Sequence, residues 1–367
     1  MDNKLKLAII YGGRSGEHEV SLMSARSVLS VIDHSKFDVL EIGITRQGVW
    51  LIGEDLWSKL HQETYDDLTP AYLLPVPKNP GIYIKKNAEL VLHSELDVVF
   101  PVMHGSYSED GTLQGLFELA DIAYVGAGVL GSAVCMDKGV FKDIMTAHHM
   151  PTLPYRVFTR SQVEEDMDKC MALAEEIASY PLFTKPANLG SSVGITKCNS
   201  RSDLIEGFIE AARYDRRIIV EEGIQNAREI EVSVLGNDDP TASIPGEIVP
   251  RDVFYTYKEK YINDTAELLI PADLPDEVSA QLQEMAIKAY RATDCAGMAR
   301  VDFLIDRNTN HLYLSEINTI PGFTKISMYP KLWEASGLSY PALIEKLIEL
   351  ALERKTQRDR IEREFRS

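Results

Sequence analysis

The first third of the chain alternates short apolar runs with segments of helical periodicity, and this alternation constrains the fold more than any other feature. The run LKLAII ends at Gly12-Gly13, VSLMSARSVLSVI carries apolar residues at helical spacing, and FDVLEIGIT indicates a second strand. Further on, LDVVFPVM indicates a buried strand and TLQGLFELA a helix. Units of this kind form parallel sheets with sites beyond the carboxyl ends of their strands. We therefore predict an α/β protein whose first domain contains a parallel sheet.

The pattern changes near residue 137. We expect a helix over SQVEEDMDKCMALAEEIASY, strands over LFTKPA, SVGITK and RIIVEEGI, and a helix between the last two. EIEVSVLG and ASIPGEIV are strand-like, DEVSAQLQEMAIKAYRAT is helical, and ERKTQRDRIEREFRS is expected to be a solvated charged end. A chain of 367 residues exceeds one compact core. These changes predict three domains, over residues 1–137, 138–222 and 223–367.

Charge and cysteine content exclude several classes of protein. The chain has 56 Asp and Glu residues against 38 Lys and Arg, a formal net charge of −18, which argues against a nucleic-acid partner. No apolar run reaches the roughly 20 residues of a membrane helix, and no signal peptide precedes LKLAII, so we expect no membrane partner and a cytoplasmic location. The four cysteines form no CxxC pair, and we expect buried thiols rather than zinc ligands or disulfides.

One glycine-rich motif has two interpretations. GAGVLG, residues 126–131, matches the G-x-G-x-x-G fingerprint of dinucleotide-binding domains. That fingerprint requires an acidic residue at the end of a second strand about 20 residues later, and the strand-like PYRVFTR offers none. We therefore favour a packing turn that joins the first domain to the second.

The strongest functional signal is a predicted hairpin, ARVDFLIDRNTNHLYLSEINT. Because side chains alternate along a strand, Arg300 and Asp302 share one face of its first strand, and Glu316 and Asn318 share one face of its second. Carboxylates within apolar strand runs need a partner, and such oxygen ligands suit Mg²⁺, which also binds substrate phosphates. The hairpin predicts a metal site at Asp302, Glu316 and Asn318, with exposed strand charges as the alternative.

The segment FTKPANLGSSVGITK, residues 183–197, has the glycines of a phosphate loop but is no Walker motif, because its lysine precedes them. Lys185 follows an apolar strand run, and Lys138 lies between apolar neighbours in CMDKGVFK. Either lysine alone could be a surface residue with a buried stem, but two aimed at one polyphosphate would bind it. The backbone N–H groups of GSSVG can also bind a phosphate. Together with the hairpin, these features predict nucleotide binding.

Several motifs together resemble the D-alanine–D-alanine ligases, ATP-grasp enzymes of bacterial cell-wall synthesis. They are GGRSGEHEVSL, MHGSYSEDGTLQG, SAVCMDKGVFK, KPANLGSSVGITK, EIEVSVLG, the R-x-D to E-x-N hairpin, FYTYKEKY and INTIPGFTKISMYPKLWEASGLSYP. The resemblance covers nearly the whole chain. It implies a three-domain ATP-grasp architecture with an amino-terminal Rossmann-like domain. It also implies ATP-dependent ligation of two D-alanine molecules through a D-alanyl phosphate, for peptidoglycan precursor synthesis. A D-alanine–D-lactate ligase, another ATP-grasp ligase and a nucleotide-binding regulator are the alternatives.

The resemblance implies roles on the nucleotide side of the site. Lys138 and Lys185 would hold the α- and β-phosphates, with Ser191 and Ser192 in the phosphate loop. Glu221 would read the adenine amino group, and Glu229 would bind the ribose. A lid over about residues 253–267 would close on the nucleotide through Phe254, Tyr255 and Tyr257, and would bring Lys260 to the γ-phosphate. Asp302, Glu316 and Asn318 would bind two Mg²⁺ ions, for which Mn²⁺ is a possible substitute.

The resemblance also implies roles on the amino-acid side. Glu17 would bind the ammonium of the first D-alanine, with Ser191 and Tyr261 completing a hydrogen-bonded set, and Tyr261 would favour D-alanine over D-lactate as acceptor. Arg300 would support the acyl phosphate, and the backbone N–H near Gly322 would stabilise the oxyanion. His104, Ser327 and Met328 would line the place of the second amino acid, although His104 has a structural role as its alternative. The family also leads us to expect a homodimer.

Overall fold

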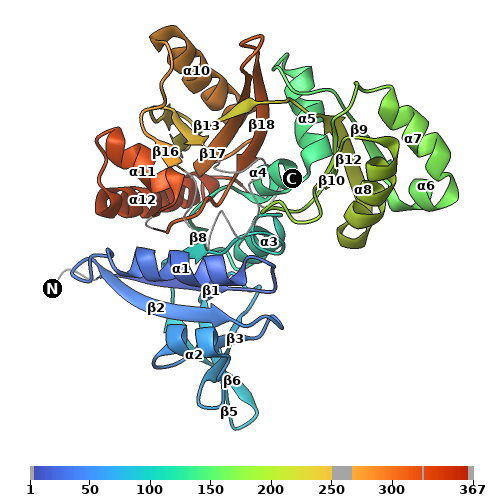
Figure 1. Ribbon diagram of the computed structural model, residues 1–367. Helices are drawn as coiled ribbons and strands as arrows, with labels where there is room; N and C mark the ends of the chain where they lie inside the picture. The colour runs from blue at the N-terminus through green and yellow to red at the C-terminus, as the bar shows by residue number, and fades with distance from the viewer. Residues whose placement is uncertain (1–3, 250–266, 325, 363–367) are drawn as a thin grey trace.

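A computed structural model describes residues 4–249, 267–324 and 326–362 (Figure 1). Three sheets follow one another along the described chain, with eight, four and six strands. The predicted lid lies almost wholly outside the described residues, and so do its functional candidates Phe254, Tyr255, Tyr257, Lys260 and Tyr261. The roles assigned to them stay predictions.

The first sheet has the strand order β6-β5-β4-β3-β2-β1-β7-β8. Its strands β1 (Leu5–Gly12), β2 (Phe37–Ile44), β7 (Val98–Val102) and β8 (Ala123–Tyr124) pair in parallel, which confirms the predicted parallel sheet. Four strands that the sequence did not predict continue it in antiparallel pairing: β3 (Trp50–Ile52), β4 (Thr69–Leu73), β5 (Gly81–Lys86) and β6 (Glu89–Glu95). The helices of this part are α1 (His18–Leu29), α2 (Leu56–Gln62) and α3 (Thr112–Leu119).

The second sheet is antiparallel throughout, in the order β11-β10-β12-β9. Its strands are β9 (Tyr155–Thr159), β10 (Leu182–Pro186), β11 (Thr196–Cys198) and β12 (Arg217–Glu222), with α8 (Arg201–Tyr214) before the last. The strand predicted over SVGITK is wrong except at its end, because Ser191, Ser192 and Gly194 have left-handed backbone angles that a strand cannot contain.

The long helix predicted before β10 is also wrong, since it is two helices, α6 (Arg160–Glu165) and α7 (Met167–Glu175). Asp166 has a φ of −151° that a helix does not allow, and its side chain accepts a hydrogen bond from the Lys169 N–H. An aspartate in this position starts a new helix, so it ends the first one.

The third sheet has the order β16-β15-β13-β17-β18, with β14 paired to β13. Its strands are β13 (Ala227–Gly236), β14 (Thr241–Ala242), β15 (Gly246–Val249), β16 (Glu267–Leu269), β17 (Gly297–Asp306) and β18 (Leu312–Asn318), so ASIPGEIV is two strands rather than one. Helices α10 (Asp276–Ala292), α11 (Met328–Ala335) and α12 (Tyr340–Arg358) complete this part. Strands β17 and β18 form the predicted hairpin.

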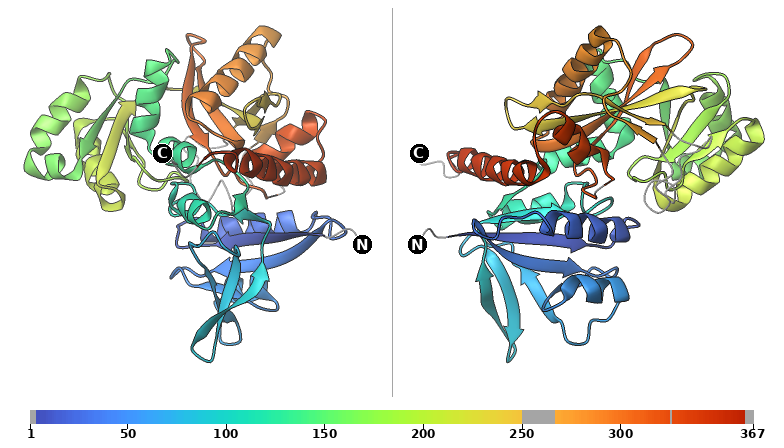
Figure 2. Two further views of the ribbon diagram at one scale, coloured as in Figure 1. Left: turned by 180° about the vertical axis from the view of Figure 1, so that it is seen from behind. Right: turned by 60° about the vertical axis from the view of Figure 1, so that its left-hand side comes forward.

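Two helices pack across the predicted domain boundaries. Leu343 and Leu347 of α12 share one apolar cluster with Leu7 of the first sheet, and both views of Figure 2 show α12 between the first and third sheets. Similarly, Phe141 of α5 (Lys138–Ala147) packs with Val232 of the third sheet. The boundaries at 137 and 222 stay predictions.

The charged end is anchored, so the expectation of a solvated tail is wrong as far as residue 358. Arg354 donates hydrogen bonds to the carbonyl oxygens of Gly126 and Tyr124 and lies 4.2 Å from the centre of the Tyr124 ring. Arg358 pairs with Glu118 at 2.6 Å. These cations satisfy carbonyl groups and acids at the edge of the first sheet.

The glycine-rich motif at 126–131 acts in packing. A Cβ atom on Gly131, in α4 (Val129–Met136), would lie 2.8 Å from the carbonyl oxygen of Asp294. Only glycine allows α4 to approach the turn between α10 and β17, which contains Asp294, so closely. The packing interpretation of the motif therefore accounts for this glycine.

Among the described residues, no helix has the length and apolar character that crossing a membrane demands.

Candidate functional site

A cavity of about 250 Å³ lies between the second and third sheets, at the amino-terminal end of α5. Figure 1 shows the two sheets and α5 as ribbons. Strands β10 and β12 form one side, and β13, β17 and β18 form the other. The structure brings most of the described nucleotide-site candidates to this cavity: Lys138, Lys185, Ser191, Ser192, Glu221, Glu229, Asp302 and Glu316. Residues far apart in the sequence thus line one space of the size of a small ligand.

The acids of the hairpin face one another across β17 and β18. Asp302 is paired in register with Glu316, and Arg300 with Asn318. The Asn318 Nδ2 atom donates to Asp302 at 3.0 Å, while Arg300 donates twice to the same carboxylate at 2.7 Å. Glu231 of β13, which the sequence reasoning missed, pairs with Arg300 at 3.0 Å. Its position in the alternating strand EIEVSVLG was the available signal.

The donor set of this hairpin fits Mg²⁺. Among the described residues, no group of three or more His, Cys, Asp and Glu side chains is placed to hold a metal ion. The predicted ligands Asp302 and Glu316 are two carboxylates, and Asn318 adds an amide oxygen, so further ligands must come from water or substrate. Mg²⁺ in phosphate-transferring sites is bound in this way, by one or two carboxylates together with phosphate oxygens.

Two lysines enclose one buried glutamate beside the cavity. Lys185 Nζ donates to one oxygen of Glu221, and Lys142 Nζ lies 3.0 Å from the other. Burial would raise the pKa of Glu221, but the two ammonium groups lower it to about 2, so this carboxylate is ionised. Burial opposes the charge of Lys185, yet the attraction of Glu221 raises the pKa of Lys185 above its usual value. Sequence reasoning missed Lys142, which lies four residues after Lys138 on α5.

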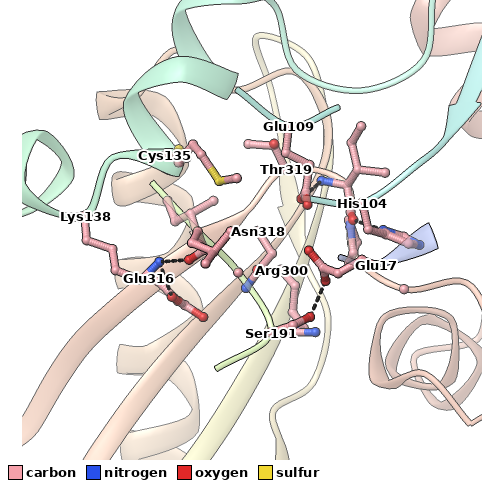
Figure 3. A pocket seen from close by; sticks show the side chains of 17 residues that line it. Glu17, His104, Glu109, Cys135, Lys138, Ser191, Arg300, Glu316, Asn318 and Thr319 are labelled. Carbon is pink, nitrogen blue, oxygen red and sulfur yellow. Dashed lines mark hydrogen bonds and ion pairs between the residues drawn. The ribbon is translucent and has the colours of Figure 1, made fainter. Parts of the chain in front are cut away.

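The phosphate loop connects the nucleotide side of the site to the amino-acid side, because its residue Ser191 contacts Glu17. Ser191 and Ser192 have φ angles of 53° and 58°. Ser191 Oγ donates a hydrogen bond to Glu17, which α1 places at the end of the first sheet (Figure 3). Gly190 lies so close that its Cβ would be 3.1 Å from Glu17. Glu17 and Ser191 thus come together as predicted, while Tyr261 lies outside the described residues.

A second, smaller cavity of about 60 Å³ adjoins the first (Figure 3). Both cavities are lined by Lys138, Ser191 and Glu316, so they share a wall. Other residues that line the smaller one are Glu17, His104, Glu109, Arg300, Asn318 and Gly322. Acids and the guanidinium group of Arg300 line the same small space, which suits a small molecule with both an ammonium and a carboxylate group.

Glu109 is a second residue that the sequence reasoning missed. Its carboxylate accepts hydrogen bonds from the N–H groups of Gly105 and Ile320, at 2.7 and 3.0 Å. Burial and the nearby charge of Glu17 raise its pKa to about 8, although those two N–H donors and Arg300 oppose the shift. The signal was present, since Glu109 is one of the two acids in the quoted motif HGSYSEDG.

His104 has both ring nitrogens engaged by the protein. Nδ1 is 3.0 Å from the Ile320 carbonyl oxygen, which only accepts, so Nδ1 carries the proton. Nε2 is 3.0 Å from Ser24 Oγ and therefore accepts. Burial lowers the pKa of His104 to about 4. The hydrogen bond to Ile320 opposes this shift, and the positive charge of Arg300 adds to it. His104 lines the smaller cavity, but its contacts favour the structural alternative.

The remaining described candidates, Ser327 and Met328, are absent from the residues that line this cavity. Ser327 precedes α11, and its Oγ accepts a hydrogen bond from the Thr324 N–H at 3.0 Å. A Cβ on Gly322 would lie 2.7 Å from that oxygen, so Gly322 and Ser327 are neighbours. Met328 is buried in a small apolar cluster with Ile248 and Leu332. The acceptor-site roles of Ser327 and Met328 stay predictions.

The fold and the site together define a class of protein. The cavity between two antiparallel sheets, with acids on one strand pair and lysines opposite, is consistent with the ATP-grasp architecture that the motifs predicted. Residues 6–127 match the family model for the D-ala D-ala ligase N-terminus, and residues 144–349 match that for the D-ala D-ala ligase C-terminus. The chain belongs to the D-alanine–D-alanine ligase family, which confirms the family predicted from the motifs.

Individual relatives match over nearly their whole length. The chain is similar to the D-alanine–D-alanine ligases of Heliobacterium modesticaldum (49% identity, 97% of each chain) and Acetivibrio thermocellus (48% identity, 96% of this chain and 97% of the relative). Its fold resembles the D-alanine-D-alanine ligase of Coxiella burnetii, with a TM-score of 0.81, 35% identity and coverage of 97% and 96%. It also resembles the VanG D-Ala:D-Ser ligase of Enterococcus faecalis, with a TM-score of 0.84, 37% identity and coverage of 95% and 100%.

Proposed function

We propose that the chain joins two D-alanine molecules to D-alanyl-D-alanine, with ATP converted to ADP and phosphate, for the synthesis of peptidoglycan precursors. The observation that carries this proposal is the pair of adjoining cavities. One is large and lined by lysines and acids, and the other is small and lined by Glu17 and Arg300. A nucleotide in the first and an amino acid in the second would meet at their shared wall.

The first step is phosphoryl transfer. Glu17 binds the ammonium group of the first D-alanine. A carboxylate oxygen of that D-alanine attacks the γ-phosphorus of ATP. One O–P bond forms, the bond to the bridging oxygen of ADP breaks, and a D-alanyl phosphate results. Lys138 and Lys185 hold the phosphates of ATP during this transfer, because ammonium groups stabilise the charge that moves to the leaving ADP.

The second step is amide formation. The neutral amine of the second D-alanine attacks the acyl carbonyl carbon, phosphate leaves, and the amine loses a proton. Arg300 and the backbone N–H of Gly322 line the smaller cavity and stabilise the negative charge on the carbonyl oxygen. Because water would destroy the acyl phosphate, the reaction requires a closed site.

Asp302, Glu316 and Asn318 are the residues that would hold magnesium. We propose two Mg²⁺ ions, with Mn²⁺ as a substitute. When bound, the metal neutralises charge on the transferring phosphoryl group.

Labelled substrate tests the proposed route. D-alanine with ¹⁸O in its carboxylate should deliver one label to the released phosphate, because the attacking oxygen stays with phosphorus. Label confined to the dipeptide would contradict an acyl phosphate. Phosphate release that does not depend on D-alanine would contradict the proposed function as a whole and would favour another ATP-grasp ligase. No phosphate release with any amino acid would favour a nucleotide-binding regulator.

The acceptor is the finer part of the proposal. D-Alanine is favoured because several relatives with 46–50% identity are D-alanine–D-alanine ligases, whereas the D-Ala:D-Ser ligase is 37% identical. A product assay with equimolar D-alanine, D-serine and D-lactate decides between them. D-Alanyl-D-alanine should dominate, and D-alanyl-D-lactate or D-alanyl-D-serine as main product would overturn the acceptor.

We also propose that the chain is cytoplasmic. We further propose that it forms a homodimer, as the family leads us to expect. Sedimentation equilibrium at micromolar concentration should give twice the 41.1 kDa chain mass. A monomer there would contradict the oligomeric state without affecting the reaction.

A further inference from the structure

A buried cluster of three charges joins α5 to the second sheet. Glu221 of β12 has one carboxylate oxygen bound to Lys185 of β10 and the other 3.0 Å from Lys142 of α5. The side chains of Glu221 and Lys142 are 6% and 2% exposed, so water does not solvate either charge. The nucleotide site described above uses Lys185 and Glu221, but it assigns nothing to Lys142.

The two lysines differ in what they can reach. Lys185 lines the large cavity, whereas Lys142 is absent from the residues that line it. The ammonium group of Lys142 lies 5.6 Å from the centre of the ring of Tyr155, which is also absent from the residues that line the cavity. Lys142 therefore contacts Glu221 but would not touch a nucleotide.

Binding a polyphosphate requires Lys185 to change partners. Its ammonium group is held by Glu221 and is also attracted by Glu229 and Glu316. Turning toward a phosphate removes one cation from Glu221. A buried carboxylate left without a cation is strongly destabilised, so the exchange would be opposed if Lys185 were its only partner.

We infer that Lys142 is a positioning residue, the permanent counter-ion of Glu221 that allows Lys185 to turn to the phosphates of the nucleotide. The inference rests on the proposed function, since it assumes that ATP binds in the large cavity. In the ligand-free protein, the single negative charge of Glu221 is shared between the ammonium groups of Lys142 and Lys185. In the complex, Lys142 keeps Glu221 paired while Lys185 and the phosphates pair with each other.

The test compares ligands with and without a polyphosphate. Isothermal titration calorimetry would measure binding of adenosine and of ADP to the parent protein and to Lys142→Met, which has a similar length and no charge. Lys142→Met should weaken ADP binding about tenfold or more, because Glu221 then retains Lys185. Adenosine affinity should change less than about twofold. Equal ADP affinity in both proteins, or an equal loss for adenosine and ADP, would overturn the inference.

A double variant provides the matched control, and it also serves if Lys142→Met fails to fold. In Glu221→Gln the carboxylate is gone, so the charge of Lys142 no longer matters to Lys185. Adding Lys142→Met to Glu221→Gln should therefore leave ADP affinity within about twofold. A further loss of about tenfold would show that Lys142 acts on the phosphates directly and would also overturn the inference.

The outcomes separate the inference from the proposed function. If the parent protein binds neither ADP nor ATP, the proposed function fails. If the parent binds ADP and Lys142→Met binds it equally well, only the role of Lys142 is contradicted.

Discussion

The individual side chains of the site are mostly buried charges with opposite charges beside them. Arg300 binds both Asp302 and Glu231, and Lys185 binds Glu221. Such pairs contribute little to stability, because desolvation offsets their attraction. Their concentration around one cavity is better explained by a ligand that brings charges of its own.

Removing one carboxylate tests the metal site. Glu316→Gln should lower metal affinity by more than about tenfold and raise the Mg²⁺ concentration for half-maximal activity accordingly. The side chain is 34% exposed, so the variant should stay folded. Glu349→Gln removes an exposed acid of α12 and should leave the Mg²⁺ dependence unchanged. Normal turnover of Glu316→Gln at low Mg²⁺ would exclude Glu316 as a ligand.

His104 offers a test that depends on pH. Its pKa of about 4 in the folded protein lies below the usual 6.5, so the unfolded chain binds a proton first as pH falls. The stability that neutral His104 contributes is therefore complete above pH 6.5 and is lost as pH falls toward 4. The unfolding free energy of the parent should fall, through this residue, by on the order of 3 kcal/mol over that range.

Urea unfolding at pH 7 and at pH 4.5 measures this contribution. His104→Gln should show the smaller decline between the two pH values, whatever its stability at pH 7. His34→Gln, at an exposed position, should decline as the parent does. Equal declines in His104→Gln and the parent would mean that His104 titrates normally.

Among the elements, α12 is the one whose role differs most from its sequence pattern. Its charged end binds the first sheet through Arg354, and its apolar residues join that sheet's core. Arg354→Ala leaves the carbonyl oxygens of Gly126 and Tyr124 without this donor. The free energy of unfolding should fall by about 1–3 kcal/mol.

Chemical denaturation measures this loss. Lys346→Ala on the same helix is its control, because that exposed lysine pairs with the exposed Glu349 at the surface. The control should change stability by less than about 0.5 kcal/mol. An Arg354→Ala protein as stable as the control would mean that the apolar residues alone hold α12.

At the scale of the whole molecule, the large cavity is lined by strands of two different sheets, the second and the third. A nucleotide would contact β10 and β12 on one side and β17 and β18 on the other, so it should slow hydrogen exchange on both. Exchange measured by mass spectrometry with saturating ADP should fall over residues 182–198 and 297–318. The distant strands β4 to β6 of the first sheet are the internal control and should not change. Protection limited to one sheet would place the nucleotide elsewhere.

Local patterns were sufficient for much of the fold and of the site. Apolar runs and helical spacing predicted β1, α1, β2 and β7, because burial of one side of an element leaves a period in its sequence. The alternation along β17 and β18 predicted that Arg300 and Asp302 share one face and that Glu316 and Asn318 share one face. The register of the hairpin then brings Asp302 opposite Glu316. The motifs were specific enough to predict the family.

Other features were decided by the tertiary structure alone. Glu109 and His104 both bind the backbone of Ile320, more than 200 residues away in the chain. Lys142 looks like any helix lysine until β12 places Glu221 against it. Periodicity reports that a side of an element is buried, but it does not report which distant element covers it. The partner of a buried charge, and with it the chemistry of that charge, is therefore determined only when the sheets pack together.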